Sequence, residues 1–99
     1  MAQTPEAKVK KQIKAILEKH GVYYAMPIGS GFGNSGVPDF LCCMNGTFLA
    51  IEAKAGKGTT TALQDKHLRK IEEAGGRTLV INEKLLELGT LQAVLENMK

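Results

Sequence analysis

The dipeptide Asn45-Gly46 determines how the segments on either side of it pair. Asn-Gly is the strongest short-range signal for a two-residue hairpin turn, and apolar, β-prone residues flank it on both sides. Counting outward from the turn, Leu41 faces Ala50. Two positions further along each strand, Asp39 faces Glu52. The sequence therefore predicts an antiparallel hairpin with two carboxylates side by side at its open end.

These paired carboxylates need a cation close by. Directly opposed residues in a sheet have Cβ atoms about 4.5–5.5 Å apart, so like charges at such positions destabilise the pairing. Lys54 lies two residues beyond Glu52, on the same face of the strand and diagonal to Asp39. An aspartate, a glutamate and a lysine thus converge at one end of the hairpin.

The chemistry of this cluster suits the hydrolysis of phosphate esters. Mg²⁺ and Mn²⁺ prefer oxygen ligands, and Mg²⁺ usually takes only one or two carboxylates. A lysine ammonium can orient the attacking water or neutralise charge in the transition state. The alternative is a solvated strand end without a function. The flanking hairpin residues are almost all apolar on both faces, and charges at the ends of such covered strands are costly unless paired or functional.

At these residues the chain also resembles a known family. Gly36-Val37-Pro38-Asp39 followed by Glu52-Ala53-Lys54 is similar to the PD-(D/E)XK nuclease core, and more narrowly to the virus-type replication-repair nuclease (VRR-NUC) domain. The narrower resemblance adds an early helical glutamate, matched by Glu6, and a glutamine opening the helix after the lysine strand, matched by Gln64. The resemblance extends roughly from Thr4 to Ile81.

The resemblance implies a metal-dependent endonuclease that hydrolyses DNA phosphodiester bonds and leaves a 5′-phosphate. It implies that Mg²⁺ or Mn²⁺ is bound by Asp39, Glu52 and the carbonyl oxygen of Ala53, and that Lys54 positions the attacking water. Related stand-alone domains are similar to Holliday-junction resolvases, which implies a homodimer acting on branched or structured duplex DNA in replication, recombination or repair. The preferred DNA shape stays open, since flaps, bubbles, nicked duplex and four-way junctions all fit.

Glu6 and Gln64 each have a second interpretation. The resemblance implies that Glu6 supports the metal shell and that Gln64 helps to hold Lys54 or the attacking water. An acid in the first turn of a helix also favours the helix dipole, whatever its function. Gln64 completes a capping box with Thr61, which satisfies backbone donors at the start of a helix. At the level of the sequence, both interpretations stay open for each residue.

The remaining pattern predicts an α/β fold in which helices flank a mixed sheet. The resemblance implies the same arrangement, a PD-(D/E)XK restriction-endonuclease-like core. The 99 residues are expected to form a single domain, residues 1–99. Helix and strand signals give the element order α-β-β-β-α-β-α. Besides the hairpin, the expected elements are helices 5–20, 61–74, 83–88 and 91–98 and strands 22–25 and 77–81. The stripe expected to be buried in the second helix comprises Leu63, His67, Leu68 and Ile71.

The charge and composition permit nucleic acid as a partner. The net charge is +3 and the pI is about 9.0, which suits an anionic partner without requiring one. Few aromatic residues are available to stack on unpaired bases, so duplex backbone is the expected target. Two basic patches are predicted to contact phosphates, one with Lys8, Lys10, Lys11 and Lys14, the other with Lys57, Lys66, Arg69 and Lys70. The alternative for each lysine is a solvated helix face.

Other segments carry weaker expectations. Asn34 and Ser35 lie in a glycine-rich loop that would let a DNA backbone approach the metal, with an ordinary flexible connection as the alternative. Cys42 and Cys43 are expected to be small core residues, and no cysteine or histidine spacing indicates zinc. The polar N-terminus and the lack of a long apolar run indicate a cytoplasmic protein without a membrane anchor.

The apolar C-terminal segment has two interpretations as well. It is a candidate dimer interface, and simple packing onto the sheet would use the same residues, which are Leu86, Leu88, Leu91, Val94 and Leu95. Two rival functions also remain. One is a non-catalytic DNA-binding module that keeps the nuclease fold, and the other is a small structural or interaction protein whose charges merely cap a hairpin.

Overall fold

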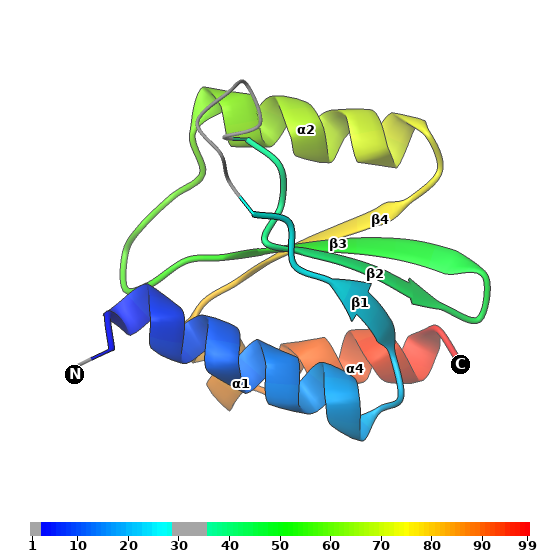
Figure 1. Ribbon diagram of the computed structural model, residues 1–99, viewed down its shortest axis with the longest axis horizontal. Coiled ribbons are helices and arrows are strands. Elements are labelled where there is room, and N and C mark those ends of the chain that lie inside the picture. Colours follow the sequence, from blue (N-terminus) through cyan, green and yellow to red (C-terminus); the bar gives the residue numbers. More distant parts are fainter. Residues whose placement is uncertain (1–2, 29–35) are drawn as a thin grey trace.

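A four-stranded mixed sheet forms the centre of the computed structural model, which describes residues 3–28 and 36–99 (Figure 1). Its strands lie in the order β1-β2-β3-β4. β1 pairs with β2 and β2 with β3 in antiparallel orientation, whereas β4 runs parallel to β3. The strands are β1 (Tyr23–Ala25), β2 (Phe40–Met44), β3 (Thr47–Ala53) and β4 (Arg77–Ile81).

Helices cover both faces of this sheet. They are α1 (Pro5–Lys19), α2 (Ala62–Glu73), α3 (Glu83–Glu87) and α4 (Thr90–Asn97). α1, α3 and α4 lie on one face, and α2 lies on the other (Figure 1). The predicted α/β class with helices flanking a mixed sheet is confirmed, and the element order is as predicted through β4, after which two helices follow instead of one. Within the two described ranges, no helix combines the length and the apolar composition needed to cross a membrane.

The predicted hairpin register is confirmed. Asn45 and Gly46 both adopt positive φ, at 50° and 78°, as a type I′ turn requires of its two central residues. Counting from this turn, β2 and β3 pair through Leu41 with Ala50 and end with Phe40 opposite Ile51. The next residues outward are therefore Asp39 and Glu52, at the open end of the hairpin.

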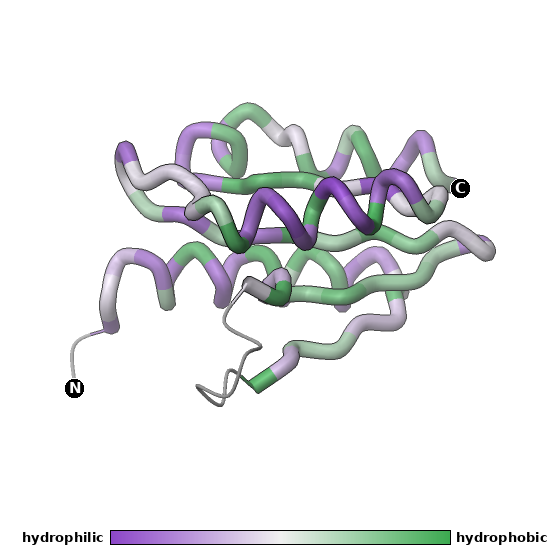
Figure 2. The backbone as a smooth tube through the Cα atoms, turned by 90° about the horizontal axis from the view of Figure 1, so that it is seen from above, coloured by the Kyte–Doolittle hydropathy of each residue, from purple (hydrophilic) through white to green (hydrophobic). Residues whose placement is uncertain are grey.

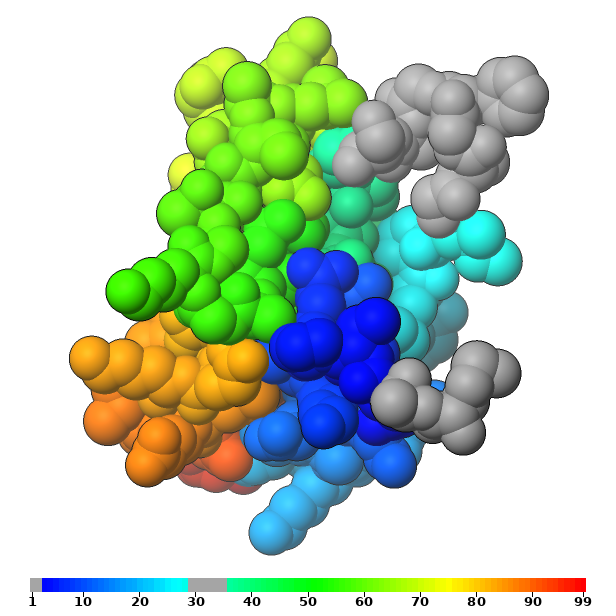
Figure 3. Space-filling view, turned by 90° about the vertical axis from the view of Figure 1, so that its left-hand side faces the viewer, coloured from blue at the N-terminus to red at the C-terminus, as the bar shows by residue number. Residues whose placement is uncertain are grey.

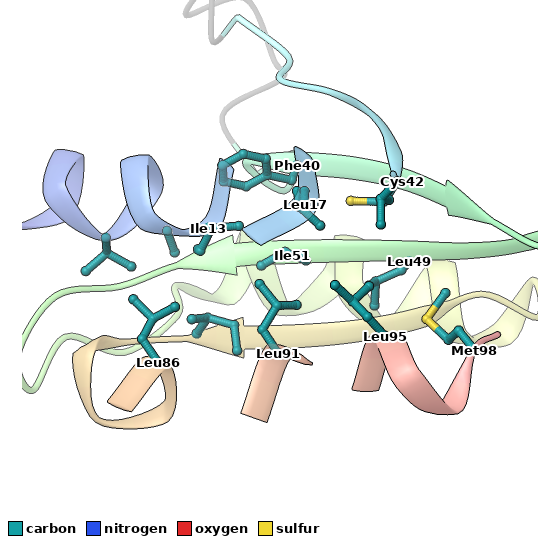
Figure 4. Packing of buried hydrophobic residues seen from close by; sticks show 14 residues of the cluster. Ile13, Leu17, Phe40, Cys42, Leu49, Ile51, Leu86, Leu91, Leu95 and Met98 are labelled. Atoms are coloured by element: carbon teal, nitrogen blue, oxygen red, sulfur yellow. The ribbon is translucent and has the colours of Figure 1, made fainter. Parts of the chain in front are cut away.

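The core lies between the sheet and the helices α1, α3 and α4, which cover one of its faces (Figure 4). The C-terminal segment contributes Leu86, Leu91 and Leu95, which are all buried. The interpretation of this segment as a dimer interface is therefore wrong for these three residues, because their side chains fill the core. Leu88 is the exception, with 68% of its surface exposed.

The opposite face of the sheet is only partly covered. α2 packs against β4 and does not extend over β1 and β2 when the molecule is seen from above (Figure 2). No residue of α2 is fully buried, and Leu63 is 40% exposed, so the predicted buried stripe is wrong. Periodicity identified which side of the helix faces the sheet but not how shallow the contact is. Cys43 lies on this partly covered face and is exposed, whereas Cys42 lies on the other face and is buried, so the expectation of a core residue is wrong for Cys43.

The different burial of Leu91 and Leu88 gives a test of the packing. Leu91→Ala should lower the free energy of unfolding by about 2–5 kcal/mol, because it leaves a cavity in the core. Leu88→Ala removes the same atoms from an exposed position and should change that free energy by less than about 0.5 kcal/mol. Urea unfolding followed by circular dichroism measures both, and equal losses would contradict the packing described here.

Candidate active site

The two carboxylates lie at the end of the sheet where α1 and α2 both begin (Figure 1). In the space-filling view of this end, the start of α1 (dark blue) lies beside the green segment that follows β3, and α2 lies above it (Figure 3). Helix N-termini carry partial positive charge from their free N–H groups. The ends of both helices therefore favour anions at this edge of the sheet.

Asp39 is held by the backbone of the neighbouring strand. Its Oδ2 accepts a hydrogen bond from the Ala53 N–H at 2.8 Å. Asp39 directly precedes Phe40, the last paired residue of β2, and its side chain accepts a backbone hydrogen bond from β3 beyond the end of the β2–β3 pairing. In an extended strand, the N–H and C=O of one residue point to the same side, so the Ala53 carbonyl also faces the Asp39 side. That orientation suits the predicted role of this carbonyl as a metal ligand.

Glu52 is the one buried charged side chain recorded among the described residues, at 3% exposure. Its Oε2 accepts a hydrogen bond from Gln64 Nε2 at 3.1 Å and lies 3.6 Å from the ammonium of Lys54. Burial, and secondly the charge and hydrogen bond of Asp39, raise the pKa of Glu52 to about 7, while Lys54 pulls it down. One lysine thus compensates only part of the cost of this buried carboxylate.

Gln64 forms the predicted capping box and also contacts the Glu52 carboxylate, while its role in holding Lys54 or the attacking water stays a prediction. Its side-chain Oε1 accepts a hydrogen bond from the Thr61 backbone N–H at 2.9 Å, and its backbone N–H donates to Thr61 Oγ1 at 3.2 Å. These two bonds complete the capping box of α2. A backbone N–H can only donate, so the amide oxygen must face Thr61 and the amide nitrogen must face Glu52. The cap thereby fixes the rotamer that presents a donor to the Glu52 carboxylate.

Glu6 lies at the edge of the site, with a lysine between it and Asp39. Lys10 Nζ is 3.3 Å from Asp39 Oδ1 and 3.7 Å from Glu6 Oε2. The direct support of a metal by Glu6 stays a prediction. The contact between Lys10 and Asp39 was missed at the level of the sequence. The spacing of Glu6 and Lys10 signals an i,i+4 ion pair, but nothing in the sequence shows that α1 docks against the start of β2.

The donor set at this end consists of oxygen atoms. Across residues 3–28 and 36–99, no cluster of three or more His, Cys, Asp or Glu side chains is arranged around a metal position. The charged ligands available are therefore the two carboxylates, Asp39 and Glu52, with the Ala53 carbonyl beside them. This set suits a hard cation that keeps several of its waters. Burial and Asp39 disfavour the ionised form of Glu52, and a cation placed beside it would favour that form.

Exposed basic side chains lie on α1, on α2 and on the loop after β3. They are Lys8 and Lys11 on α1, Lys57 in the loop, and Lys66, Arg69 and Lys70 on α2. Their contact with DNA stays a prediction. Asn34 and Ser35 lie outside the described residues.

The family of the chain follows from its sequence. Residues 3–85, most of the chain, match the family model described as archaeal Holliday junction resolvase (Hjc). The chain belongs to the Hjc family. Membership of a resolvase family supports a structure-selective nuclease that hydrolyses phosphodiester bonds. No curated protein matches the chain in sequence.

Solved structures place the Hjc-family chain in the predicted fold. A VRR_NUC domain superposes with a TM-score of 0.70 at 24% identity, covering 86% of this chain and 97% of that one. Hjc from Archaeoglobus fulgidus, a Holliday junction resolvase from an archaeal hyperthermophile, superposes with a TM-score of 0.60 at 20% identity, covering 78% and 69%. The predicted resemblance to VRR-NUC and the PD-(D/E)XK core is confirmed.

The raised pKa of Glu52 predicts how stability depends on pH. Folding raises the pKa of this acid from 4.5 to about 7, so the folded protein holds the proton more tightly than the unfolded chain. The free energy of unfolding therefore falls as pH rises across that interval. Glu52→Gln keeps the shape, and its amide oxygen can still accept from Gln64 and Lys54. In EDTA, the variant should gain about 1–3 kcal/mol relative to wild type between pH 5 and pH 8.

Urea unfolding at the two pH values measures this gain. Glu87→Gln, an exposed substitution on α3, is the matched control and should stay within about 0.5 kcal/mol of wild type at both. A Glu52→Gln variant that is less stable than wild type at pH 8 would show that the ionised carboxylate is a net stabiliser.

Proposed function

We propose that this chain is a Mg²⁺- or Mn²⁺-dependent endonuclease that cuts branched duplex DNA. The observation that carries the proposal is the juxtaposition of Asp39 and Glu52 with the Lys54 ammonium on the Glu52 carboxylate. Membership of the Hjc family supports the substrate class.

Each residue of the site has a defined task in this proposal. A divalent cation bound here supplies charge stabilisation on the phosphate and lowers the pKa of water. Asp39 presents a carboxylate fixed by the Ala53 N–H, so its position needs no rearrangement. Glu52 must be ionised to act as a ligand, and cation binding favours the ionised form because opposite charge lowers a carboxyl pKa.

Lys54 and Gln64 hold the ionised Glu52 in place. Gln64 donates a hydrogen bond to Oε2 and the Lys54 ammonium forms an ion pair with the same oxygen, so the second oxygen of the carboxylate would be available to the cation. The Lys54 side chain is 13% exposed, so it is nearly buried but keeps some contact with solvent. From there it can donate to the attacking water or to the scissile phosphate, which places positive charge where negative charge develops.

A homodimer is part of the proposal. A symmetric junction must be cut on two strands, and one compact chain offers one such site, so two copies related by a twofold axis meet the requirement. The uncovered face of the sheet offers an apolar surface for a second copy. Tyr23 is 75% exposed there and Phe48 is 40% exposed, and the register places both on the same side of the sheet.

The cleavage of labelled flap, bubble, nicked and four-way DNA tests the proposal. Wild type should cut branched DNA with Mg²⁺ or Mn²⁺ and not with EDTA. Asp39→Asn and Lys54→Ala should each lose about 100-fold or more in rate, because each removes charge on which the transition state depends. Lys19→Ala, at the far end of α1, controls for the loss of an exposed lysine.

The rival functions predict different outcomes in the same assay. A non-catalytic DNA-binding module would bind branched DNA equally well with metal or EDTA, and neither wild type nor any variant would cut it. A hairpin whose charges are only structural would bind weakly and with strong salt dependence. Paired incisions at symmetric positions of a four-way junction would support the homodimer.

The two roles of Gln64 can be separated by a pair of variants. Gln64→Glu keeps an acceptor for the Thr61 N–H but replaces the donor to Glu52 with a negative charge, so the cleavage rate should fall about tenfold or more. Thr61→Ala removes the hydroxyl cap but leaves the backbone N–H that orients Gln64. It should cost about 1 kcal/mol of stability and retain cleavage. Equal loss of cleavage in both variants would assign Gln64 a capping role alone.

A further inference from the structure

Lys10 occupies the side of Asp39 that the backbone leaves free. Asp39 Oδ2 is taken by the Ala53 N–H, and Lys10 Nζ lies 3.3 Å from Oδ1. The second carboxylate, Glu52, has its own lysine, Lys54. Each of the two site carboxylates thus has one lysine ammonium beside it, and Lys10 also contacts Glu6.

From this arrangement we infer that Lys10 is a displaceable counter-ion, which holds Asp39 until a divalent cation binds and is then released to a DNA phosphate. The inference rests on the proposed function, since it needs a cation at Asp39 and Glu52. A cation on Asp39 would lie within a few ångströms of the Lys10 ammonium, and like charges at that distance repel. Lys10 and the metal therefore compete for the same carboxylate.

Burial distinguishes Lys10 from Lys54 as the lysine that moves. The Lys54 side chain is 13% exposed, its carboxylate partner is 4% exposed, and its backbone N–H is bonded to the Ile81 carbonyl at 2.9 Å. The Lys10 side chain is 33% exposed, on the surface of a helix, and shares its charge between Asp39 and a 44% exposed Glu6. Exposed, shared ion pairs are weak, so the four-carbon stem of Lys10 can swing away at small cost.

The released ammonium joins a surface that already suits DNA. Lys8 and Lys11 lie on the same helix and are exposed. Metal binding would therefore add one cation to this surface, and a phosphate that captures Lys10 would in turn vacate Asp39 for the metal. By thermodynamic linkage the two effects must be equal, so metal and DNA should strengthen one another's binding. Lys10 is in this sense a positioning residue that couples the two ligands.

The sign of one affinity change tests the inference. Mn²⁺ binding to the DNA-free protein is measured by titration calorimetry for wild type, Lys10→Met and Lys10→Gln. If Lys10 competes with the metal, both variants should bind Mn²⁺ about tenfold more tightly, the effect of removing one charge near a divalent ion. Lys14→Met, one turn further along α1 and exposed, controls for net charge and should change the affinity less than about twofold because salt screens it.

DNA binding supplies a second readout. Anisotropy of a labelled four-way junction is compared in EDTA and in Ca²⁺, which takes oxygen ligands as Mg²⁺ does. Wild type should gain affinity from the cation, and Lys10→Met should gain several-fold less. A structural role of Lys10 would not alter this difference.

The opposite results have distinct meanings. If Lys10→Met binds Mn²⁺ as weakly as wild type or more weakly, Lys10 merely holds Asp39 in place and the inference is overturned while the proposed function stands. If wild type binds no Mn²⁺ and behaves like Asp39→Asn, the inference and the proposed function fail together.

Discussion

The opposition of Asp39 and Glu52 is the constraint around which this end of the molecule is built. The Asn45-Gly46 turn fixes the register, and the register leaves two carboxylates at the first unpaired positions of the hairpin. Like charges at such positions repel, and burial of Glu52 adds to the cost. The site is therefore strained electrostatically by the same pairing that gives the sheet its order, and cations and hydrogen-bond donors relieve this strain.

The surrounding elements supply that relief in different ways. β3 provides Lys54 two residues beyond Glu52, where a strand returns to the same face. The start of α2 provides an amide donor, whose orientation is set by a helix cap rather than by the site itself. α1 provides Lys10 from a solvent-facing turn. A compact fold thus compensates two carboxylates with groups from three elements, which explains why the site lies where these elements meet.

Features that depend on local spacing could be predicted from the sequence. The turn fixes the register, and the alternation of side chains along a strand then places Asp39, Glu52 and Lys54. A one-residue shift of the register would move all of these side chains to the other face of the sheet. The capping box of Gln64 is also local. Its second bond, to Glu52, was not predicted, since the resemblance implies a contact with Lys54 or the attacking water; the bond and the cap are compatible because an amide has two distinct ends.

Features that depend on how elements dock could not be predicted. The periodicity of α2 shows an apolar side but not that the helix covers only part of the sheet, which leaves Leu63 40% exposed. The pairing of Lys10 with Asp39 joins an early helix to a later strand, and charge spacing carries no signal for it. Because Lys10 comes from an exposed helix and Lys54 from a nearly buried strand, the two lysines are not equivalent. A buried counter-ion stabilises the carboxylate permanently, whereas an exposed one can be exchanged for a more highly charged cation.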